Sequence, residues 1–156
     1  MESEVIESES KQMEKYLFAL FVADKAAPIR GRIRLVKQVF LMAKQVQPEL
    51  ARIMRFFPYL YGPYSNPVAE AINGLIDGGY IRTYKDDGEY VYELTEKGQQ
   101  TGRERVADIP EETMQKIVRL KKTTQELSIR ELLKLVYRTY PEYAVYSKGR
   151  EVYGTS

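Results

Sequence analysis

The feature that most constrains the fold is a pair of tyrosine-rich runs separated by a short acidic turn. The runs YIRTYK (80–85) and EYVYEL (89–94) are joined by Asp86, Asp87 and Gly88. Aromatic and β-branched residues favour strands, and an Asp-Gly step between two such runs indicates a tight turn. The sequence therefore predicts an antiparallel hairpin over these residues.

A short amphipathic helix is predicted immediately before this hairpin. Ser65 is a suitable N-cap, and Pro67 stands in the first turn, where its missing N–H does no harm. The residues Asp77, Gly78 and Gly79 end the helix. Its apolar positions recur at helical spacing: Val68, Ala71, Ile72, Leu75 and Ile76.

The same periodicity predicts five other helices. They begin at Lys11, Arg32, Thr95, Glu111 and Ser128, and the second to fifth run to about residues 45, 106, 126 and 140. Thr95 is a candidate cap, and Ser128 with Glu131 forms a capping box. Between residues 52 and 62, Pro58 allows only an edge strand or an irregular segment.

These elements predict a mostly α-helical fold with a small β-hairpin, of the α+β class. Residues 1–10 are expected to be a disordered acidic leader, and residues 11–106 to form the main domain. Residues 107–143 would be a helical extension that packs on the domain or forms a dimer seam, and residues 144–156 a tail.

The composition excludes several classes of function. The 156 residues include no cysteine and no histidine, so thiolate and imidazole metal sites and the commonest general base are absent. No spacing indicates a nucleophile–base pair or a phosphate-binding loop, so we expect neither enzyme activity nor a metal or cofactor.

The N-terminus lacks a signal peptide and no apolar run reaches membrane-spanning length, so a cytoplasmic protein is expected.

Two motifs around the hairpin resemble a known superfamily. The stretches LIDGGYIR (75–82) and YVYELTEKGQQ (90–100) are similar to the wing region of winged helix–turn–helix regulators of the MarR and PadR type. The resemblance covers roughly residues 65–100. It implies a winged helix–turn–helix in which residues 66–77 form the third helix and the hairpin forms the wing.

A fainter likeness extends over residues 29–143. The stretches IRGRIRLVKQVFLM, YLYGPYSNPV and ELLKLVYRTYPEY resemble uncharacterised prokaryotic proteins of the YwgA type, which are also described as phage-associated or antitoxin-like. This resemblance implies a winged-helix core with an aromatic insertion before the third helix. By analogy with MarR-type regulators, the helices over 111–140 would form a homodimer seam.

The resemblance makes double-stranded DNA the first candidate partner and transcriptional regulation the first candidate function. Residues 11–156 carry a formal charge of +6, from 24 bases and 18 acids. Asn66 and Asn73 would face the major groove. The other candidate contacts are Arg30, Arg32, Arg34, Lys37, Tyr64, Ser65, Arg82 and Lys85. The simpler alternative is that these bases only solvate exposed faces.

The third helix argues against DNA and leaves a second hypothesis open. It holds Glu70 and Asp77 but no base, and the wing tip KDDGE has one base and three acids. Because phosphate neutralisation dominates DNA affinity, such elements are poorly suited to bind it. The alternative is a winged helix that binds a protein partner without direct contact with DNA.

Overall fold

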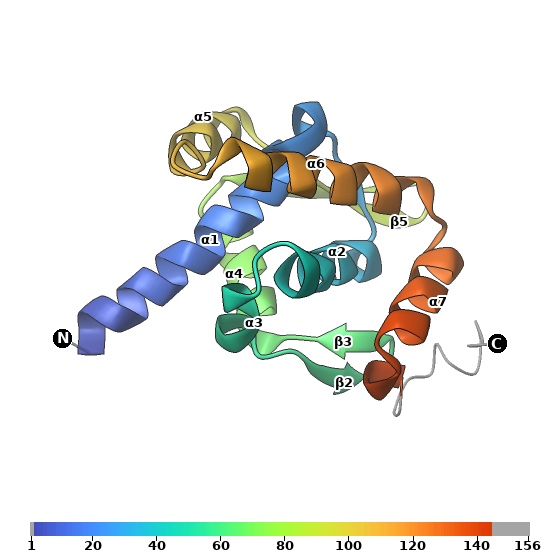
Figure 1. Cartoon of the computed structure of the whole chain (residues 1–156). Helices are drawn as coiled ribbons and strands as arrows, with labels where there is room; N and C mark the ends of the chain where they lie inside the picture. The colour runs from blue at the N-terminus through green and yellow to red at the C-terminus, as the bar shows by residue number, and fades with distance from the viewer. Residues whose placement is uncertain (1, 145–156) are drawn as a thin grey trace.

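The computed structural model describes the backbone of residues 2–144 and the side chains of residues 9–144. This part of the chain is mostly helical, with short antiparallel strands, as the sequence predicts (Figure 1). The elements are α1 (Glu2–Ala26), β1 (Ile29–Arg30), α2 (Arg32–Gln45), α3 (Glu49–Met54), β2 (Phe57–Tyr59), β3 (Gly62–Tyr64), α4 (Asn66–Asp77), β4 (Ile81–Asp86), β5 (Glu89–Leu94), α5 (Glu96–Arg105), α6 (Glu111–Glu126), α7 (Ile129–Thr139) and the 3₁₀ helix η1 (Pro141–Ala144).

The main sheet is antiparallel with strand order β1-β5-β4. The predicted hairpin is confirmed: β4 pairs with β5 from Ile81 opposite Leu94 to Asp86 opposite Glu89. Asp87 and Gly88 both take positive φ in its turn, as a tight hairpin requires. The third strand was not predicted, because β1 has only two residues, too few for an alternating pattern to be recognised.

Helix α2 lies at the centre of the molecule. It packs against α3, α6, α7, β1 and β3, and Figure 1 shows α6 on one side of it and the β2–β3 hairpin on the other. All its residues from Arg34 to Ala43 are buried. A helix surrounded in this way has almost no solvent-exposed side, so even its charged side chains must form hydrogen bonds inside the protein.

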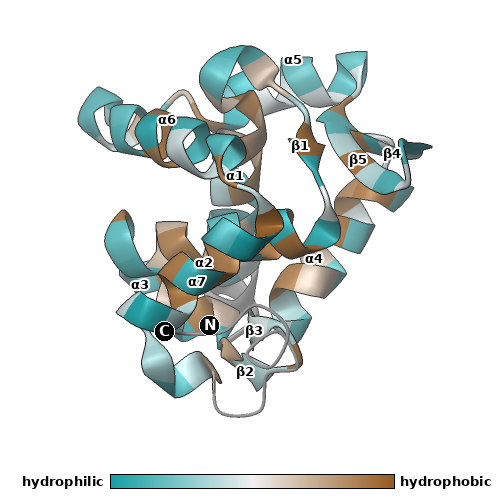
Figure 2. Cartoon of the chain, turned by 90° about the vertical axis from the view of Figure 1, so that its right-hand side faces the viewer, coloured by the Kyte–Doolittle hydropathy of each residue, from teal (hydrophilic) through white to brown (hydrophobic). Residues whose placement is uncertain are grey.

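Helix α5 approaches the core through glycine rather than through large side chains, and it is largely hydrophilic in Figure 2. Gly98 and Gly102 are its buried residues. A Cβ at Gly98 would lie 1.9 Å from the carbonyl oxygen of Tyr80, and one at Gly102 would lie 2.9 Å from Val22. These two positions let α5 lie against the start of β4 and against α1.

Helix α1 ends at a distorted turn held by a buried lysine. Asp24 and Lys25 have φ of 56° and 57°, and Ala23 has an extended backbone. The Lys121 ammonium of α6 donates to the carbonyl oxygens of Phe21 (3.1 Å) and Ala23 (2.8 Å). Lys121 therefore satisfies carbonyl groups that the end of the helix leaves without an intrahelical partner.

The predicted caps are confirmed. Ser65 accepts a hydrogen bond from the Val68 N–H and Thr95 from the Gly98 N–H. Ser128 and Glu131 form the reciprocal capping box, and the backbone and side-chain hydrogen bonds from Ser128 lower the pKa of the Glu131 carboxyl.

The chain before α4 differs from the expectation in two places. Helix α1 begins at Glu2, so its backbone includes most of the expected leader; glutamate is a good helix former and is favoured at a helix N-terminus. The edge strand predicted around Pro58 is present as β2, whereas α3 before it and its partner strand β3 were not predicted. Pro58 is tolerated because β2 and β3 form a separate two-stranded sheet, so each strand has a free edge.

The helices predicted for a dimer seam pack on their own chain. Helix α6 contacts α1 and α2, and α7 contacts α2 and η1. The apolar residues Ile117, Leu132, Leu133 and Val136 are buried there. The expected tail lies outside the described residues, apart from Ala144.

Candidate functional site

Helix α4 and the β4–β5 hairpin carry one part of the predicted DNA contacts, among them Asn66, Asn73, Arg82 and Lys85. Val68, Ile72 and Leu75 fix the orientation of α4, because they are buried in the core. The opposite side of the helix exposes Asn66, Glu70, Asn73, Gly74 and Asp77. The two asparagines are therefore accessible, as predicted, but two carboxylates lie on the same helix.

The cap of α4 is closed to ligands. Ser65 is 1% exposed, and its hydroxyl donates to the Met54 carbonyl while accepting from the Val68 N–H at 3.1 Å. Tyr64 is half-buried, with an edge contact to the Phe57 ring and a tilted contact to the Tyr59 ring. This serine, predicted as a DNA contact, is thus used to join α4 to the end of α3.

A hollow of about 590 Å³ separates the exposed side of α4 from α1. Glu70, Glu9 and Glu14 line it, together with Arg55. Glu14 forms an ion pair with Arg105 of α5. The hollow therefore continues the acidic character of α4 toward α1.

The hairpin tip is also acidic, and acids of the hairpin bind the neighbouring arginine. The Arg30 guanidinium lies 2.9 Å from Asp86 and 3.3 Å from Glu89. The hydrogen bond that the Arg30 guanidinium donates to the Asp86 carboxylate is the main cause that raises the pKa of Arg30. This predicted DNA contact is therefore already paired with two carboxylates.

The two bases on β4 are exposed, and each contacts other side chains of the hairpin. Arg82 forms an ion pair with Glu93 and lies over the Tyr84 ring, 5.3 Å from its centroid. The Lys85 ammonium lies 5.2 Å from the Tyr90 ring centroid. Both could turn toward a ligand, because exposed pairs of this kind contribute little stability.

Arg34 is an internal clamp. Its guanidinium donates to the carbonyl oxygens of Thr124 and Leu127, both at 2.6 Å, and to that of Arg30 at 3.0 Å. Burial lowers its pKa. Arg34 holds the junction between α6 and α7 against α2, so the prediction that it contacts a ligand on the surface has no support in its position.

Lys37 is internal as well. It is 3% exposed, and its ammonium donates to the Pro63 carbonyl at 3.1 Å. Burial lowers its pKa to about 7. Arg32, the remaining candidate base near the start of α2, is partly exposed, and its guanidinium carbon lies 5.9 Å from the centroid of the Tyr92 ring. The cluster at the start of α2 is therefore not a continuous surface patch.

The balance of charge within residues 65–94, which include α4 and the hairpin, is negative. Residues 65–94 contain two bases, Arg82 and Lys85, against six acids. The six acids are Glu70, Asp77, Asp86, Asp87, Glu89 and Glu93. We call the exposed part of this set on α4 and the hairpin, Glu70, Asp77, Asp86 and Asp87, the acidic face. This face favours a cationic partner.

Two further classes of site have no basis in the described residues. No group of histidine, cysteine or carboxylate side chains among them could hold a metal ion. Likewise, none of the helices in the described part of the chain has the length and apolar character needed to cross a membrane.

No family model and no curated relative matches this sequence. The assignment of function therefore rests on the fold, the acidic face and the internal use of the predicted bases.

Proposed function

We propose that this chain is a winged-helix domain that binds a basic protein partner through its acidic face. The order of elements supports the first part: β1, α2 and α4 precede a hairpin that pairs in the order β1-β5-β4. In this arrangement α4 is the third helix and β4–β5 the wing, while α3 and β2–β3 are the aromatic insertion.

One observation carries the choice of partner. The third helix and the wing hold six acids and two bases, and both of those bases contact side chains of the hairpin itself. A duplex would place phosphates against these carboxylates, which costs affinity, whereas lysines and arginines of a protein would pair with them.

The test uses capture of a partner by the whole chain and by two double variants. Glu70→Lys with Asp77→Lys should abolish capture of a stoichiometric partner. Glu104→Lys with Glu126→Lys changes the charge equally at exposed sites outside the acidic face and should leave capture intact. A partner retained equally by both variants would contradict the proposal.

Direct DNA binding is the second candidate, favoured by the exposure of Asn66, Asn73, Arg82 and Lys85. It predicts binding to a fluorescent duplex that weakens steeply between about 50 and 200 mM salt. Arg32→Glu with Arg82→Glu should then abolish binding. Arg34 is unsuitable for this test, because reversal of its charge would disrupt the junction of α6 and α7. Absence of binding at low salt would reject the DNA hypothesis.

A further inference from the structure

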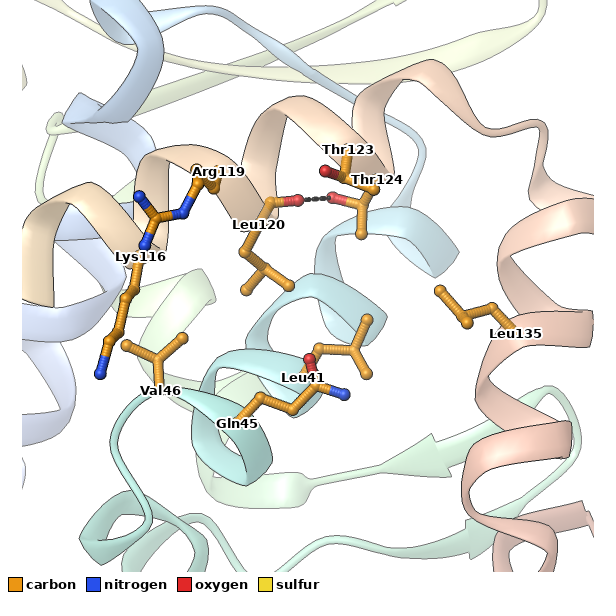
Figure 3. A pocket seen from close by; sticks show the side chains of 9 residues that line it. All are labelled: Leu41, Gln45, Val46, Lys116, Arg119, Leu120, Thr123, Thr124 and Leu135. Atoms are coloured by element: carbon orange, nitrogen blue, oxygen red, sulfur yellow. Dashed lines mark hydrogen bonds between the residues drawn. The ribbon is translucent and has the colours of Figure 1, made fainter.

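A groove of about 280 Å³ lies between α6, α7 and the C-terminal half of α2, and we call it the α6–α7 groove (Figure 3). Its walls are largely aliphatic, and the residues that supply them are Leu41, Val46, Leu120 and Leu135. Figure 3 shows Leu120 directed toward Leu41 across the groove. Leu135 is 39% exposed and is the only aliphatic member of the large, exposed apolar side chains in the described part of the chain. An apolar hollow at the surface is typical of a binding site.

The charged groups at the groove have no partner of opposite sign. Lys116 and Arg119 lie along α6 at its edge and are exposed. None of the described acids lines the groove, and neither cation forms an ion pair with a described residue. The Thr124 hydroxyl, in contrast, already donates to the Leu120 carbonyl oxygen at 2.7 Å (Figure 3). The groove therefore offers apolar contacts and two available cations.

The two helices on either side of the groove are also basic. Residues 113–140, which include most of α6 and all of α7, contain seven bases and two acids. Lys121 is the only one of these seven bases that is buried. One of the two acids, Glu131, is used in the capping box with Ser128. The charge of these helices therefore attracts a negatively charged segment.

The groove provides no strand edge, because its residues belong to α2, α6 and α7 or, in the case of Val46, follow α2 directly. The backbone groups of these helices are used within the helices, and the Val46 N–H donates to the Met42 carbonyl. A segment bound here must therefore satisfy its own backbone N–H and C=O groups, as a helix does and an extended chain does not. A cavity of about 150 Å³ holds one benzene molecule, so the groove has room for about two apolar side chains of such a helix.

We propose that the α6–α7 groove binds an acidic amphipathic helix of a partner protein. Apolar side chains three or four positions apart on one face of that helix would fill the space between Leu41, Leu120 and Leu135. Carboxylates beside them would pair with Lys116 and Arg119. A nucleic acid fits this site less well, because its phosphates would pair with the cations but leave the leucines uncovered.

This site is separate from the acidic face, so it does not rest on the proposed function. No residue of α4 or of the β4–β5 hairpin lines the groove, and the two surfaces have opposite charge. The Glu70→Lys with Asp77→Lys variant, which removes two carboxylates of the acidic face, should therefore bind at the groove as the unchanged protein does.

The first test measures the fluorescence anisotropy of a labelled helical peptide of about 16 residues, with leucine at every third or fourth position and glutamate at most others. The whole chain should bind this peptide, and Lys116→Glu with Arg119→Glu should weaken binding about tenfold or more. Arg52→Glu with Arg103→Glu changes the charge equally at exposed positions of α3 and α5 outside the groove and should leave binding intact. Absence of binding to the unchanged protein, or an equal loss in both variants, would overturn the proposal.

The second test separates the apolar contribution from the charge. Leu135→Ser, at an exposed position, should weaken peptide binding about fivefold or more, and by a similar factor at about 50 and about 200 mM salt, because salt does not screen an apolar contact. A control peptide with lysine in place of glutamate should not bind. Binding that is unaffected by Leu135→Ser, or displacement of the peptide by duplex DNA at the higher salt, would show that the groove recognises negative charge alone and would contradict the proposal.

Discussion

The Lys37 ammonium of α2 donates to the Pro63 carbonyl oxygen of β3 at 3.1 Å, inside the protein. This contact joins the central helix to the aromatic hairpin. Lys121 has an equivalent role at the end of α1, where it donates to Phe21 and Ala23. Both lysines are buried without a carboxylate partner at hydrogen-bonding distance. Burial is therefore the main influence on their pKa values, and it lowers both.

Because these two lysines are buried, we expect the stability of the protein to rise with pH above neutrality. Burial lowers the pKa of Lys37 to about 7 and that of Lys121 to about 8, from 10.5. Between these values and 10.5 the unfolded chain binds more protons than the folded one, so the free energy of unfolding increases with pH. The slope is at most about 1.4 kcal/mol per pH unit for each lysine. Urea unfolding at pH 6, 7, 8 and 9 would measure it.

Lys37→Met provides the matched control for this prediction. The variant should lose the part of the rise that begins near pH 7 and keep the part from Lys121, which begins near pH 8. The measurement should stop below about pH 10, because burial raises the pKa of Tyr16 and its ionisation in the unfolded chain opposes the rise. Stability that is constant or falling from pH 7 to pH 9 would contradict the assignment of both lysines.

A second prediction distinguishes the two neighbouring arginines of α2. Arg34→Met should destabilise the fold by about 3–5 kcal/mol, since it leaves the buried carbonyls of Thr124 and Leu127 without their donor. Arg32→Met removes only a partly exposed side chain over Tyr92 and should cost less than about 1 kcal/mol. Chemical denaturation compares the two, and equal losses would show that Arg34 is not a clamp.

The sequence contains an indication that Arg34 and Lys37 are buried inside the protein. The apolar residues of α2 run from Leu35 to Ala43 almost without interruption, which leaves little of the helix circumference for solvent. A helix with apolar residues on most sides is expected in the interior, so its bases should serve internal carbonyls. The particular partners, on α6 and β3, follow only from tertiary packing.

The hairpin and the caps were predictable because their signals are local. The turn at Asp87 and Gly88 and the capping box at Ser128 depend on a few neighbouring residues. By contrast, α3 has six residues, and β1 pairs with β5 far along the chain. Such short elements are stabilised by contacts remote in sequence, which periodicity does not reveal.

A third prediction concerns the two serine caps. Ser65→Ala should cost about 2 kcal/mol, because the buried hydroxyl serves both the Val68 N–H and the Met54 carbonyl. Ser128→Ala should cost about 1 kcal/mol or less, because its capping box is exposed and water can replace the hydroxyl. Thermal unfolding of the two variants would rank them. A larger loss at Ser128 would contradict the distinction drawn from burial.

A fourth prediction uses two helical glycines with opposite surroundings. Gly98→Ala should destabilise the fold by at least about 3 kcal/mol, because the new Cβ would lie 1.9 Å from the Tyr80 carbonyl oxygen. That oxygen also accepts the Thr95 N–H, so its displacement would disturb the start of α5.

Gly74→Ala is the control for the same change in an open position. Nothing lies within 4 Å of a Cβ at Gly74, on the exposed side of α4. Alanine should therefore stabilise this helix by about 0.5–1 kcal/mol through its better helix propensity. Denaturation midpoints should move in opposite directions for the two variants. If Gly98→Ala were neutral, α5 could not lie as close to the start of β4 as the structure places it.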